Sequence, residues 1–380
     1  MPRLLTVEDY RQVARRRLPK FIFDYVDGAA GDEVTMDRNR SALDRLQLHP
    51  RQQVDVSARS MATTVLGREV PMPLLLGPTG LQRLVHRRAD LEVAEAAGRA
   101  GVPFVVSAST AFTVEEIAAA GSGDLWLQIY PWRDRGALEH VIKRASAVGY
   151  STLVVTVDVP LLGRRERDIR NGMSIPPRIT PANVYQGARH PRWVTHLLRG
   201  PEITFVNFKD LVPDSKGMAL MKWVNEELTN PGATWDELDW LRRAWPGPLV
   251  VKGVLTVADA REAVRAGADA IVVSNHGGRQ LDHTPATIEV LPRIVDAVGG
   301  QTEVLVDGGI RRGTDILKAL ALGARAMLVG RPYWWGLAAG GSAGVRGVID
   351  VFRTELDMAM ALSGRPTVAS VGPDLLFPTD

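Results

Sequence analysis

The chain has 380 residues, of which 45% are hydrophobic and 23% charged, which is the composition of a folded globular protein. Its 46 basic and 43 acidic residues leave a net charge of +3 without a basic block, so we expect no nucleic-acid partner. The absence of cysteine excludes disulfides, zinc–thiolate and iron–sulfur sites and a thiol nucleophile, and we expect no metal site. No apolar run approaches the roughly 18–20 residues of a membrane span, and the N-terminus lacks the apolar core of a signal peptide, which favours a cytoplasmic location.

Short apolar runs alternate along the chain with alanine-rich amphipathic stretches, and this alternation predicts parallel strands joined by helices. Helical stretches end at glycines, among them Gly149, Gly267 and Gly323, as helices with a left-handed C-terminal cap do. The runs that predict strands are Leu74–Gly77, Phe104–Ser107, Leu125–Tyr130, Thr152–Asp158, Leu249–Lys252, Ala270–Asn275, Val304–Asp307 and Ala326–Gly330.

Polar residues recur at the C-terminal ends of these apolar runs. Thr156 and Ser274 follow a helix-ending glycine by seven residues, and Asp158 and His276 follow it by nine. Positions two apart on a strand share a face, so the two residues of each run should point the same way. Polar residues would also follow strands that are unrelated in space. In a (β/α)8 TIM barrel, however, the C-terminal ends of the strands surround one mouth, which holds the active site. We therefore predict an α/β protein with this barrel fold.

A barrel of this kind needs about 250 residues, so part of the chain lies outside it. We predict an N-terminal helical segment over residues 1–60 and the barrel over residues 61–380, with a long insertion after the fourth strand over residues 176–237. The insertion exceeds an ordinary connection. It is either a solvated lid or a surface for anionic lipid, because it contains the segments RWVTHLL and MALMKWV and a basic first half. The basic residues are Arg178, Arg189, Arg192 and Arg199.

Two glycine-rich segments predict a phosphate site, Asp307–Thr314 after the seventh strand and Gly330–Pro332 after the eighth. Glycines such as Gly309 let backbone amides approach an anion, and Arg311 and Arg331 supply positive charge. This pair of loops is the usual phosphate position in TIM barrels. One glycine-rich loop could arise by chance, whereas two that agree favour a phosphorylated ligand.

His276 leaves the apolar sixth strand at the predicted mouth, where an imidazole can move a proton near neutral pH. Arg279 follows three residues later and offers a guanidinium suited to a carboxylate. Asp158 holds the equivalent place on the fourth strand and can orient the imidazole. A lone histidine is more often structural, but the adjacent glycine pair, the arginine and the acid together favour a base that acts on an anionic substrate.

Lys252 ends the fifth strand. A buried lysine is costly unless it faces an anion or an electron-rich ring, and an ion pair within the barrel is the alternative. Other strand ends place hydrogen-bonding groups around the same mouth, and the backbone after the first strand comes close to it. These positions are Ser107, Gln128, Tyr130, Thr156 and the segment Pro78–Thr79–Gly80. Such a ring beside a phosphate site suits a flat heteroaromatic cofactor with amide-like edges.

Many of the residues above lie in specific motifs: PTG at 78–80, TVDVPLLGRRERD at 156–168, KG at 252–253, SNHGGRQLD at 274–282 and DGGIRRGTDILKALALGA at 307–324. Together these motifs resemble the FMN-dependent α-hydroxy-acid oxidase/dehydrogenase family. The similarity runs from LPKFIFDYVDGAA near the N-terminus to the last strand. Within the family it is greatest to the membrane-associated (S)-mandelate and L-lactate dehydrogenases, because the chain also contains GPTGL and HPRW.

The resemblance implies an FMN enzyme that oxidises an (S)-2-hydroxy acid to the 2-oxo acid. It implies that His276, paired with Asp158, takes a proton from the substrate while two electrons reach flavin N5, as a carbanion step or as hydride. Arginines and tyrosines would bind the substrate, namely Arg165, Arg279, Tyr25 and Tyr130. The flavin ring would contact Pro78, Thr79, Gly80, Ser107, Gln128, Thr156 and Lys252. The ribityl chain and phosphate would contact Ser274, Asp307, Gly309, Arg311, Gly330 and Arg331.

Departures from the family pattern indicate the substrate and the electron acceptor. Ser109 stands where glycolate oxidase has a tryptophan, so the pocket should admit a bulky or aromatic side chain, with Leu162 as another wall. Gly80 replaces the alanine of true oxidases, which favours a quinone-type or other membrane acceptor over oxygen. The alternatives are an oxidase that uses O2 and a flavin-barrel relative with another substrate, and the presence of both Arg165 and Arg279 argues against the latter.

The resemblance also implies a homotetramer. The basic, tryptophan-bearing segment of the insertion predicts peripheral attachment to the inner face of the cell membrane.

Overall fold

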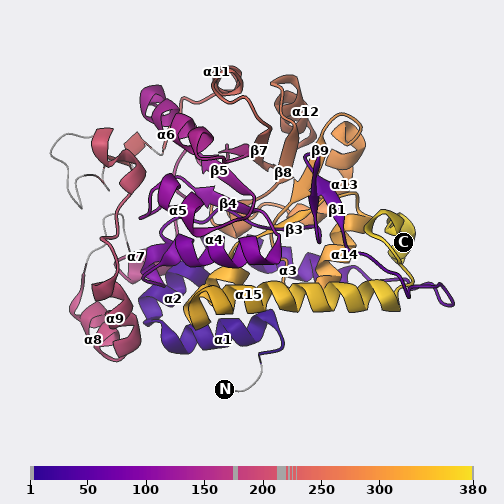
Figure 1. Cartoon of the computed structure of the whole chain (residues 1–380), viewed down its shortest axis with the longest axis horizontal. Coiled ribbons are helices and arrows are strands. Elements are labelled where there is room, and N and C mark those ends of the chain that lie inside the picture. Colours follow the sequence, from indigo (N-terminus) through magenta and orange to yellow (C-terminus); the bar gives the residue numbers. More distant parts are fainter. Residues whose placement is uncertain are drawn as a thin grey trace.

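The computed structural model describes residues 4–173, 179–211, 220, 223–224, 226–227 and 229–378. Its centre is a barrel of parallel strands (Figure 1). The barrel is closed, because β10 pairs with both β9 and β3. The barrel strands are β3 (Leu74–Leu76), β4 (Phe104–Ser107), β5 (Leu125–Ile129), β6 (Thr152–Thr156), β7 (Leu249–Val254), β8 (Ala270–Val273), β9 (Glu303–Val306) and β10 (Met327–Val329). The predicted strands and the (β/α)8 barrel are confirmed.

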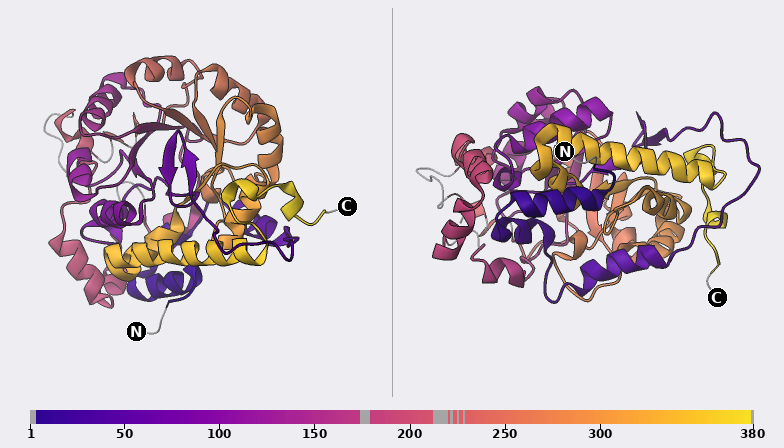
Figure 2. Two further views of the ribbon diagram at one scale, coloured as in Figure 1. Left: turned by 45° about the vertical axis from the view of Figure 1, so that its right-hand side comes forward. Right: turned by 90° about the horizontal axis from the view of Figure 1, so that it is seen from below.

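Helices connect the strands and surround the barrel (Figure 2). Their starts follow from local sequence, because the Thr113 and Asp134 side chains accept backbone N–H groups at the beginnings of α5 and α6. The predicted helix-ending glycines at 149, 267 and 323 have φ of +88°, +82° and +93°. The helices are α4 (Ala89–Ala100), α5 (Val114–Ala120), α6 (Arg135–Ala147), α11 (Glu237–Ala244), α12 (Val257–Arg265), α13 (Thr287–Val298), α14 (Gly313–Ala321) and α15 (Arg331–Leu362).

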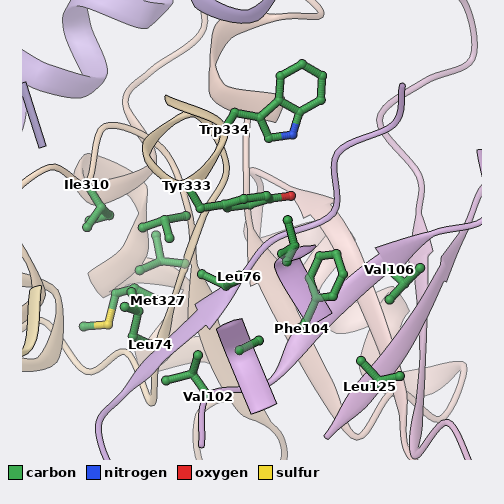
Figure 3. Packing of buried hydrophobic residues seen from close by; sticks show 14 of the residues in the cluster. Leu74, Leu76, Val102, Phe104, Val106, Leu125, Ile310, Met327, Tyr333 and Trp334 are labelled. Carbon is green, nitrogen blue, oxygen red and sulfur yellow. The ribbon is translucent and has the colours of Figure 1, made fainter. Parts of the chain in front are cut away.

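The strands bury one set of side chains inside the barrel and another against the helices. Leu75 and Val105 belong to the cluster inside the barrel. Leu74 and Leu76, on either side of Leu75, belong to the outer cluster and lie near Tyr333 of α15 (Figure 3). The alternation fixes the register of each strand, and with it the direction of the side chains at the strand ends.

An antiparallel hairpin that the sequence did not predict precedes the barrel, β1 (Thr63–Val65) and β2 (Arg68–Val70). Its valines pack with the residues inside the barrel. The Leu66 N–H donates to Glu303 Oε2, on the first residue of β9, at 3.0 Å. The hairpin therefore covers the N-terminal end of the barrel, opposite the mouth.

The N-terminal segment is helical only in its first part, which comprises α1 (Val7–Arg17), α2 (Lys20–Asp27) and α3 (Val34–Arg45). Helix α1 packs along α15 (Figure 1). The prediction of helices throughout residues 1–60 is wrong for residues 46–60, which contain Pro50 and no helix. That stretch instead forms isolated β-bridges with the C-terminal segment, Leu48 with Leu376 and Ser60 with Thr367.

The described part of the insertion after β6 is mainly helical and packs on the barrel. Trp193 donates its indole N–H to the Leu84 carbonyl at 2.7 Å. The buried Arg83 donates to the carbonyls of Leu197 and Pro201 at 2.7 and 2.9 Å. Its elements are α8 (Pro181–Ala188), α9 (Pro191–Arg199) and the 3₁₀ helix η2 (Val206–Leu211), and α7 (Glu166–Arg170) lies between β6 and the insertion.

Arg178, one of the basic residues singled out in the insertion, lies outside the described residues. Within the described part of the chain, no helix combines the length and the apolarity needed to cross a membrane.

Single 3₁₀ turns complete the structure: η1 (Gln82–Leu84), η3 (His276–Gly278), η4 (Val368–Ser370) and η5 (Pro373–Leu375).

Candidate active site

A pocket opens where the C-terminal ends of the barrel strands meet, at the place that the sequence predicted. The space inside it is about 1260 Å³ when the open mouth and the adjoining solvent are included. The predicted residues that line it are Tyr25, Pro78, Thr79, Gly80, Ser107, Ser109, Tyr130, Leu162, Arg165, Lys252, His276, Arg279, Asp307, Gly309, Arg311, Gly330 and Arg331.

Four predicted residues do not line the pocket but contact one another or the residues that do. Gln128 donates from Nε2 to Thr156 Oγ1 at 3.0 Å, so the two side chains bridge β5 and β6. Ser274 Oγ accepts the backbone N–H of His276 at 3.1 Å. Asp158 is bonded to the His276 ring. These four side chains form a polar layer that supports the pocket wall.

His276 lies in a turn that the following glycines permit. Its φ of +56° and those of Gly277 and Gly278, +64° and +79°, are in the left-handed region. A Cβ on Gly278 would lie 2.8 Å from the Met36 backbone nitrogen. The turn places His276 Nδ1 3.0 Å from Asp158 Oδ1, so the predicted pair of imidazole and carboxylate is present.

Electrostatics keep the imidazole neutral and the carboxylate ionised. Burial lowers the pKa of His276; Asp158 opposes this shift and Lys252 adds to it. The neutral ring donates Nδ1–H to Asp158, which leaves the Nε2 lone pair as a base. Burial raises the pKa of Asp158, but His276 and Lys252 outweigh burial and hold that pKa below its usual range. Among the described residues, Asp158 Oδ2 has no hydrogen-bond partner.

Lys252 reaches the pocket at a β-bulge, where the pairing of β7 with β8 changes register. Gly253 in the bulge has a φ of +112°, and a Cβ there would lie 2.7 Å from the Asp158 Cβ. The buried Lys252 ammonium donates to Ser274 Oγ at 3.0 Å and lies 3.3 Å from Asp307 Oδ2. Burial lowers the pKa of Lys252, but Asp307 and Asp158 outweigh burial and raise it. Lys252 thus both forms an ion pair and presents a fixed positive charge to the pocket.

Arg165 and Arg279 lie on neighbouring loops, after β6 and β8. Arg165 Nε donates to the Arg279 carbonyl at 3.4 Å. Arg279 Nη1 donates to the carbonyls of Tyr25 and Gly28 at 2.8 and 2.9 Å, and its guanidinium carbon lies 5.2 Å from the centre of the Tyr25 ring. Burial lowers the pKa of Arg279, and the charge of Arg165 lowers it further. An anionic ligand would therefore be stabilised between these two side chains.

The loops after β9 and β10 also bring positive charge to the pocket, and Arg331 donates to the same Gly28 carbonyl as Arg279. Gly309 has a φ of +80°, and a Cβ on it would lie 2.5 Å from the Asn39 carbonyl oxygen. The Arg311 guanidinium lies 4.9 Å from the Trp335 ring centre. Burial lowers the pKa of Arg311 and of Arg331 to about 10, so both stay charged at neutral pH. Arg331 additionally ties loops together by donating to the carbonyls of Asp27, Gly28 and Gly277.

Residues 14–378 match the FMN-dependent dehydrogenase family. The chain belongs to this family. It is 45% identical over 360 residues to the L-lactate oxidase of Nostoc sp., across 94% of this chain and 93% of that protein. It is 41% identical over 370 residues to the L-lactate dehydrogenase of Vibrio parahaemolyticus, across 97% of each. It superposes on the crystal structure of the monotopic membrane protein (S)-mandelate dehydrogenase with a TM-score of 0.95 and 40% identity, across 99% of this chain and 100% of that one.

These matches confirm the family and the cofactor that the sequence predicted. The protein is an FMN-dependent 2-hydroxy-acid dehydrogenase or oxidase. The pocket fits FMN by its own chemistry, because the buried Asp307 Oδ1 has no hydrogen-bond partner among the described residues and could accept from a ribityl hydroxyl. Gly309 and Arg311 would hold the phosphate, and Lys252 would contact the ring. These individual contacts stay predictions.

Other pocket residues were not predicted from the sequence, among them Gln280, Trp334 and Phe205. Gln280 lies in the motif of the sixth strand and donates to the Asp158 carbonyl at 3.0 Å, so the motif could have indicated it. Trp334 follows the last strand closely and donates its indole N–H to Thr79 Oγ1. Phe205 belongs to the insertion, where no motif or hydrophobic period marks it.

Gly309→Ala should reduce FMN binding. A left-handed φ costs an L-residue about 1–2 kcal/mol, and the new Cβ would also collide with the Asn39 carbonyl. Flavin absorbance per polypeptide and the Tm would both fall. Gly300→Ala is the matched control, because nothing lies within 4 Å of its Cβ position. Full flavin content and an unchanged Tm in Gly309→Ala would contradict the assignment of this loop.

Proposed function

We propose that this enzyme oxidises (S)-2-hydroxy acids with an aromatic side chain, such as (S)-mandelate, to the 2-oxo acids. FMN-dependent oxidation of 2-hydroxy acids follows from the family, while the side chain, the base and the acceptor are proposed. The observation that carries the proposal is that His276, bonded to Asp158, shares one pocket with Arg165 and Arg279. A base and a pair of arginines in one cavity suit a 2-hydroxy acid, which carries a hydroxyl group next to a carboxylate.

Each group then has a defined task. Arg165 and Arg279 bind the substrate carboxylate and orient the molecule. His276 takes a proton from the substrate at Nε2, and the ionised Asp158 stabilises the resulting imidazolium at Nδ1–H. FMN, when bound beside the substrate, would supply the two-electron acceptor that the oxidation of the α-carbon requires.

Two tyrosines complete the polar wall of the pocket. Burial raises the pKa of Tyr130 to about 12, and Lys252 opposes that shift. The Tyr130 hydroxyl therefore remains protonated and can donate to the substrate. Tyr25, held under Arg279, presents its ring to the same space. Both tyrosines position the substrate rather than exchange its proton.

The aromatic side chain is favoured by the small residue at position 109. Ser109 is buried, lines the pocket and donates its backbone N–H to Ser107 Oγ at 3.2 Å. Leu162 and Val159 add apolar side chains to the same pocket. A phenyl ring can occupy such a space at little cost in desolvation.

Anaerobic mixing with (S)-mandelate tests the proposed reaction, with the visible absorbance of the flavin as the readout. We expect rapid bleaching by (S)-mandelate and slower bleaching by L-lactate. Bleaching by L-lactate alone would contradict the aromatic side chain but keep the reaction. Bleaching by neither acid, in protein that contains FMN, would contradict the proposal as a whole.

We further propose a quinone-type electron acceptor, with O2 as the alternative. Gly80 supports this choice, because it stands where the true oxidases that the chain resembles have alanine, and a Cβ at that position would lie only 3.2 Å from the Ser109 carbonyl. A membrane quinone requires the protein to reach a membrane surface. The structural neighbour named a monotopic membrane protein favours such attachment.

The insertion presents an apolar and basic surface suited to a membrane interface. Ile179, Tyr185 and Leu198 leave 82%, 64% and 77% of their surfaces exposed. The same segment exposes Arg189, Arg192 and Arg199, and the guanidinium carbon of Arg189 lies 5.8 Å from the centre of the Tyr185 ring. Apolar anchors flanked by cations bind the headgroup region of anionic lipid.

Replacing the three arginines Arg189, Arg192 and Arg199 by glutamine should release the protein from anionic vesicles. Each basic side chain near such a surface contributes about 1 kcal/mol, so low-salt sedimentation with phosphatidylglycerol vesicles should show a loss of more than about 100-fold in partition. Replacement of Arg243, Arg261 and Arg293, exposed on other helices, is the control and should change little. An intact protein that never sediments with vesicles would refute the attachment.

The homotetramer stays a prediction, which sedimentation velocity would test.

A further inference from the structure

Phe205 brings the insertion into the pocket. Its side chain is 2% exposed, and it lines the cavity together with Ser109 and Leu81. The pocket residues that would bind polar parts of FMN lie at the strand ends, whereas Phe205 offers only an apolar surface. A buried aromatic side chain in this place is suited to contact the apolar part of the substrate.

The backbone around Phe205 is fixed to the loop that carries Ser109. The N–H of Val206 donates to the Thr110 carbonyl at 3.2 Å, so the residues that follow Phe205 and Ser109 are hydrogen-bonded to each other. The carbonyl of Ser109 in turn accepts the N–H of Leu81 at 3.2 Å. Phe205, Ser109 and Leu81 therefore form one continuous wall.

Asn207 holds this wall in place. It is 1% exposed, and its Oδ1 accepts the Val114 N–H at 3.1 Å. Its Nδ2 donates to the carbonyls of Ala108 and Phe112 at 3.2 and 3.4 Å. Both ends of the side-chain amide are thus used to join the insertion to the loop after β4. Such a fully bonded buried amide restrains the position of Phe205.

We propose that Phe205 is a specificity-determining residue, which forms the wall against the side chain of the 2-hydroxy acid, and that Asn207 positions it. Only the preference for an aromatic side chain rests on the proposed function. The role of Phe205 as a wall does not, because any 2-hydroxy acid must place its side chain against some wall of the pocket. The insertion would then contribute to substrate selection in addition to the membrane contact proposed above.

Steady-state kinetics of Phe205→Ala and Phe205→Leu test the proposal, with L-lactate, (S)-mandelate and the bulkier (S)-2-naphthylglycolate as substrates. For Phe205→Ala, the ratio of kcat/KM for (S)-mandelate to that for L-lactate should fall about tenfold or more, because the phenyl ring loses a packed neighbour. The ratio for the naphthyl acid to that for (S)-mandelate should rise, because the wall has receded. Phe205→Leu should shift both ratios in the same directions by less.

Phe208→Leu is the matched control. Phe208 is equally buried in the same segment, but its ring packs on Trp132 at 4.2 Å between centroids, and it does not line the pocket. Its variant should lower the Tm without changing either ratio. Ratios that stay within twofold of the wild type in Phe205→Ala, with FMN content retained, would overturn the proposal. A wild type that prefers L-lactate would refute the aromatic assignment, yet a rise in the naphthyl-to-lactate ratio in Phe205→Ala would still support the wall.

Asn207→Ala tests the positioning role separately. It should widen the range of accepted side chains by raising KM for (S)-mandelate more than it lowers kcat. Asn207→Asp keeps the acceptor to Val114 but turns a second oxygen toward the Ala108 and Phe112 carbonyls, so it should act at least as strongly as Asn207→Ala. Equal effects on all substrates would show that Asn207 supports stability alone.

Discussion

His276→Asn should retain FMN and lose reduction of the flavin by every 2-hydroxy acid. General-base catalysis typically contributes about 10²–10⁴-fold to a rate, so the anaerobic reduction rate should fall by that factor. Asparagine keeps a polar side chain of similar length, and the neighbouring glycines keep the left-handed turn accessible. Stopped-flow absorbance of the flavin measures the rate, and the flavin spectrum before mixing reports cofactor content.

The control for this variant is His283→Asn. His283 also has a left-handed φ, of +64°, but its side chain is 67% exposed. Its replacement should leave the reduction rate unchanged. Fast reduction in His276→Asn with bound FMN would refute the assignment of the base.

The same assignment predicts the acid limb of the pH–rate profile. The base must be neutral, so kcat/KM should fall as the pH drops through the pKa of His276 in the free enzyme. Since burial lowers that pKa, the midpoint should lie below the value of about 6.5 for an ordinary histidine. Asp158 raises the pKa of His276, so Asp158→Asn should move the midpoint to still lower pH while also slowing the reaction. A midpoint that moves to higher pH in this variant would contradict the pairing.

The barrel could be predicted from the sequence because its signals are local and repeated. Each buried strand is a short apolar run, and the helix-ending glycines at 149, 267 and 323 mark the register of the strands after them. Side chains at strand ends, such as those of His276 and Lys252, could therefore be assigned to one mouth. The hairpin of β1 and β2 escaped because each of its strands buries only one residue and so forms no apolar run, unlike the equally short β3 and β10. Residues 46–60 were wrongly assigned because they come after three helices without a clear change in composition.

Part of the site depends on contacts between distant segments, which no local pattern reveals. Phe205 reaches the pocket only because Asn207 bonds to the loop after β4, about one hundred residues earlier in the chain. Arg331 was predicted at the phosphate, and the structure shows that its guanidinium also joins α2 to the turn of His276. The sequence predicts which chemical groups lie at the mouth of the barrel and roughly where. The hydrogen-bond partners of each group depend on the packing of the whole barrel.

Arg279→Met should lose most of the binding energy for the substrate carboxylate. Removing one partner of a buried, hydrogen-bonded charge pair costs about 2–5 kcal/mol, so kcat/KM should fall by about 30-fold to about 4000-fold. Arg165 would remain as a single cation. Arg279→Lys should recover little, because an ammonium lacks the planar fork of a guanidinium. Added guanidinium ion at millimolar concentration should restore part of the activity of Arg279→Met.

A neutral substrate distinguishes two roles of Arg279, the binding of the substrate carboxylate and the support of the surrounding loops. Arg279 also ties the Tyr25 and Gly28 carbonyls of the N-terminal segment to the pocket, so its loss could act through α2. Methyl (S)-mandelate has no carboxylate, and its kcat/KM should change much less than that of (S)-mandelate if Arg279 binds the anion. Arg164→Met, at a neighbouring side chain that is 80% exposed, should affect neither substrate. Equal losses for the acid and its ester in Arg279→Met would show that the arginine holds the loops together and that the carboxylate is bound elsewhere.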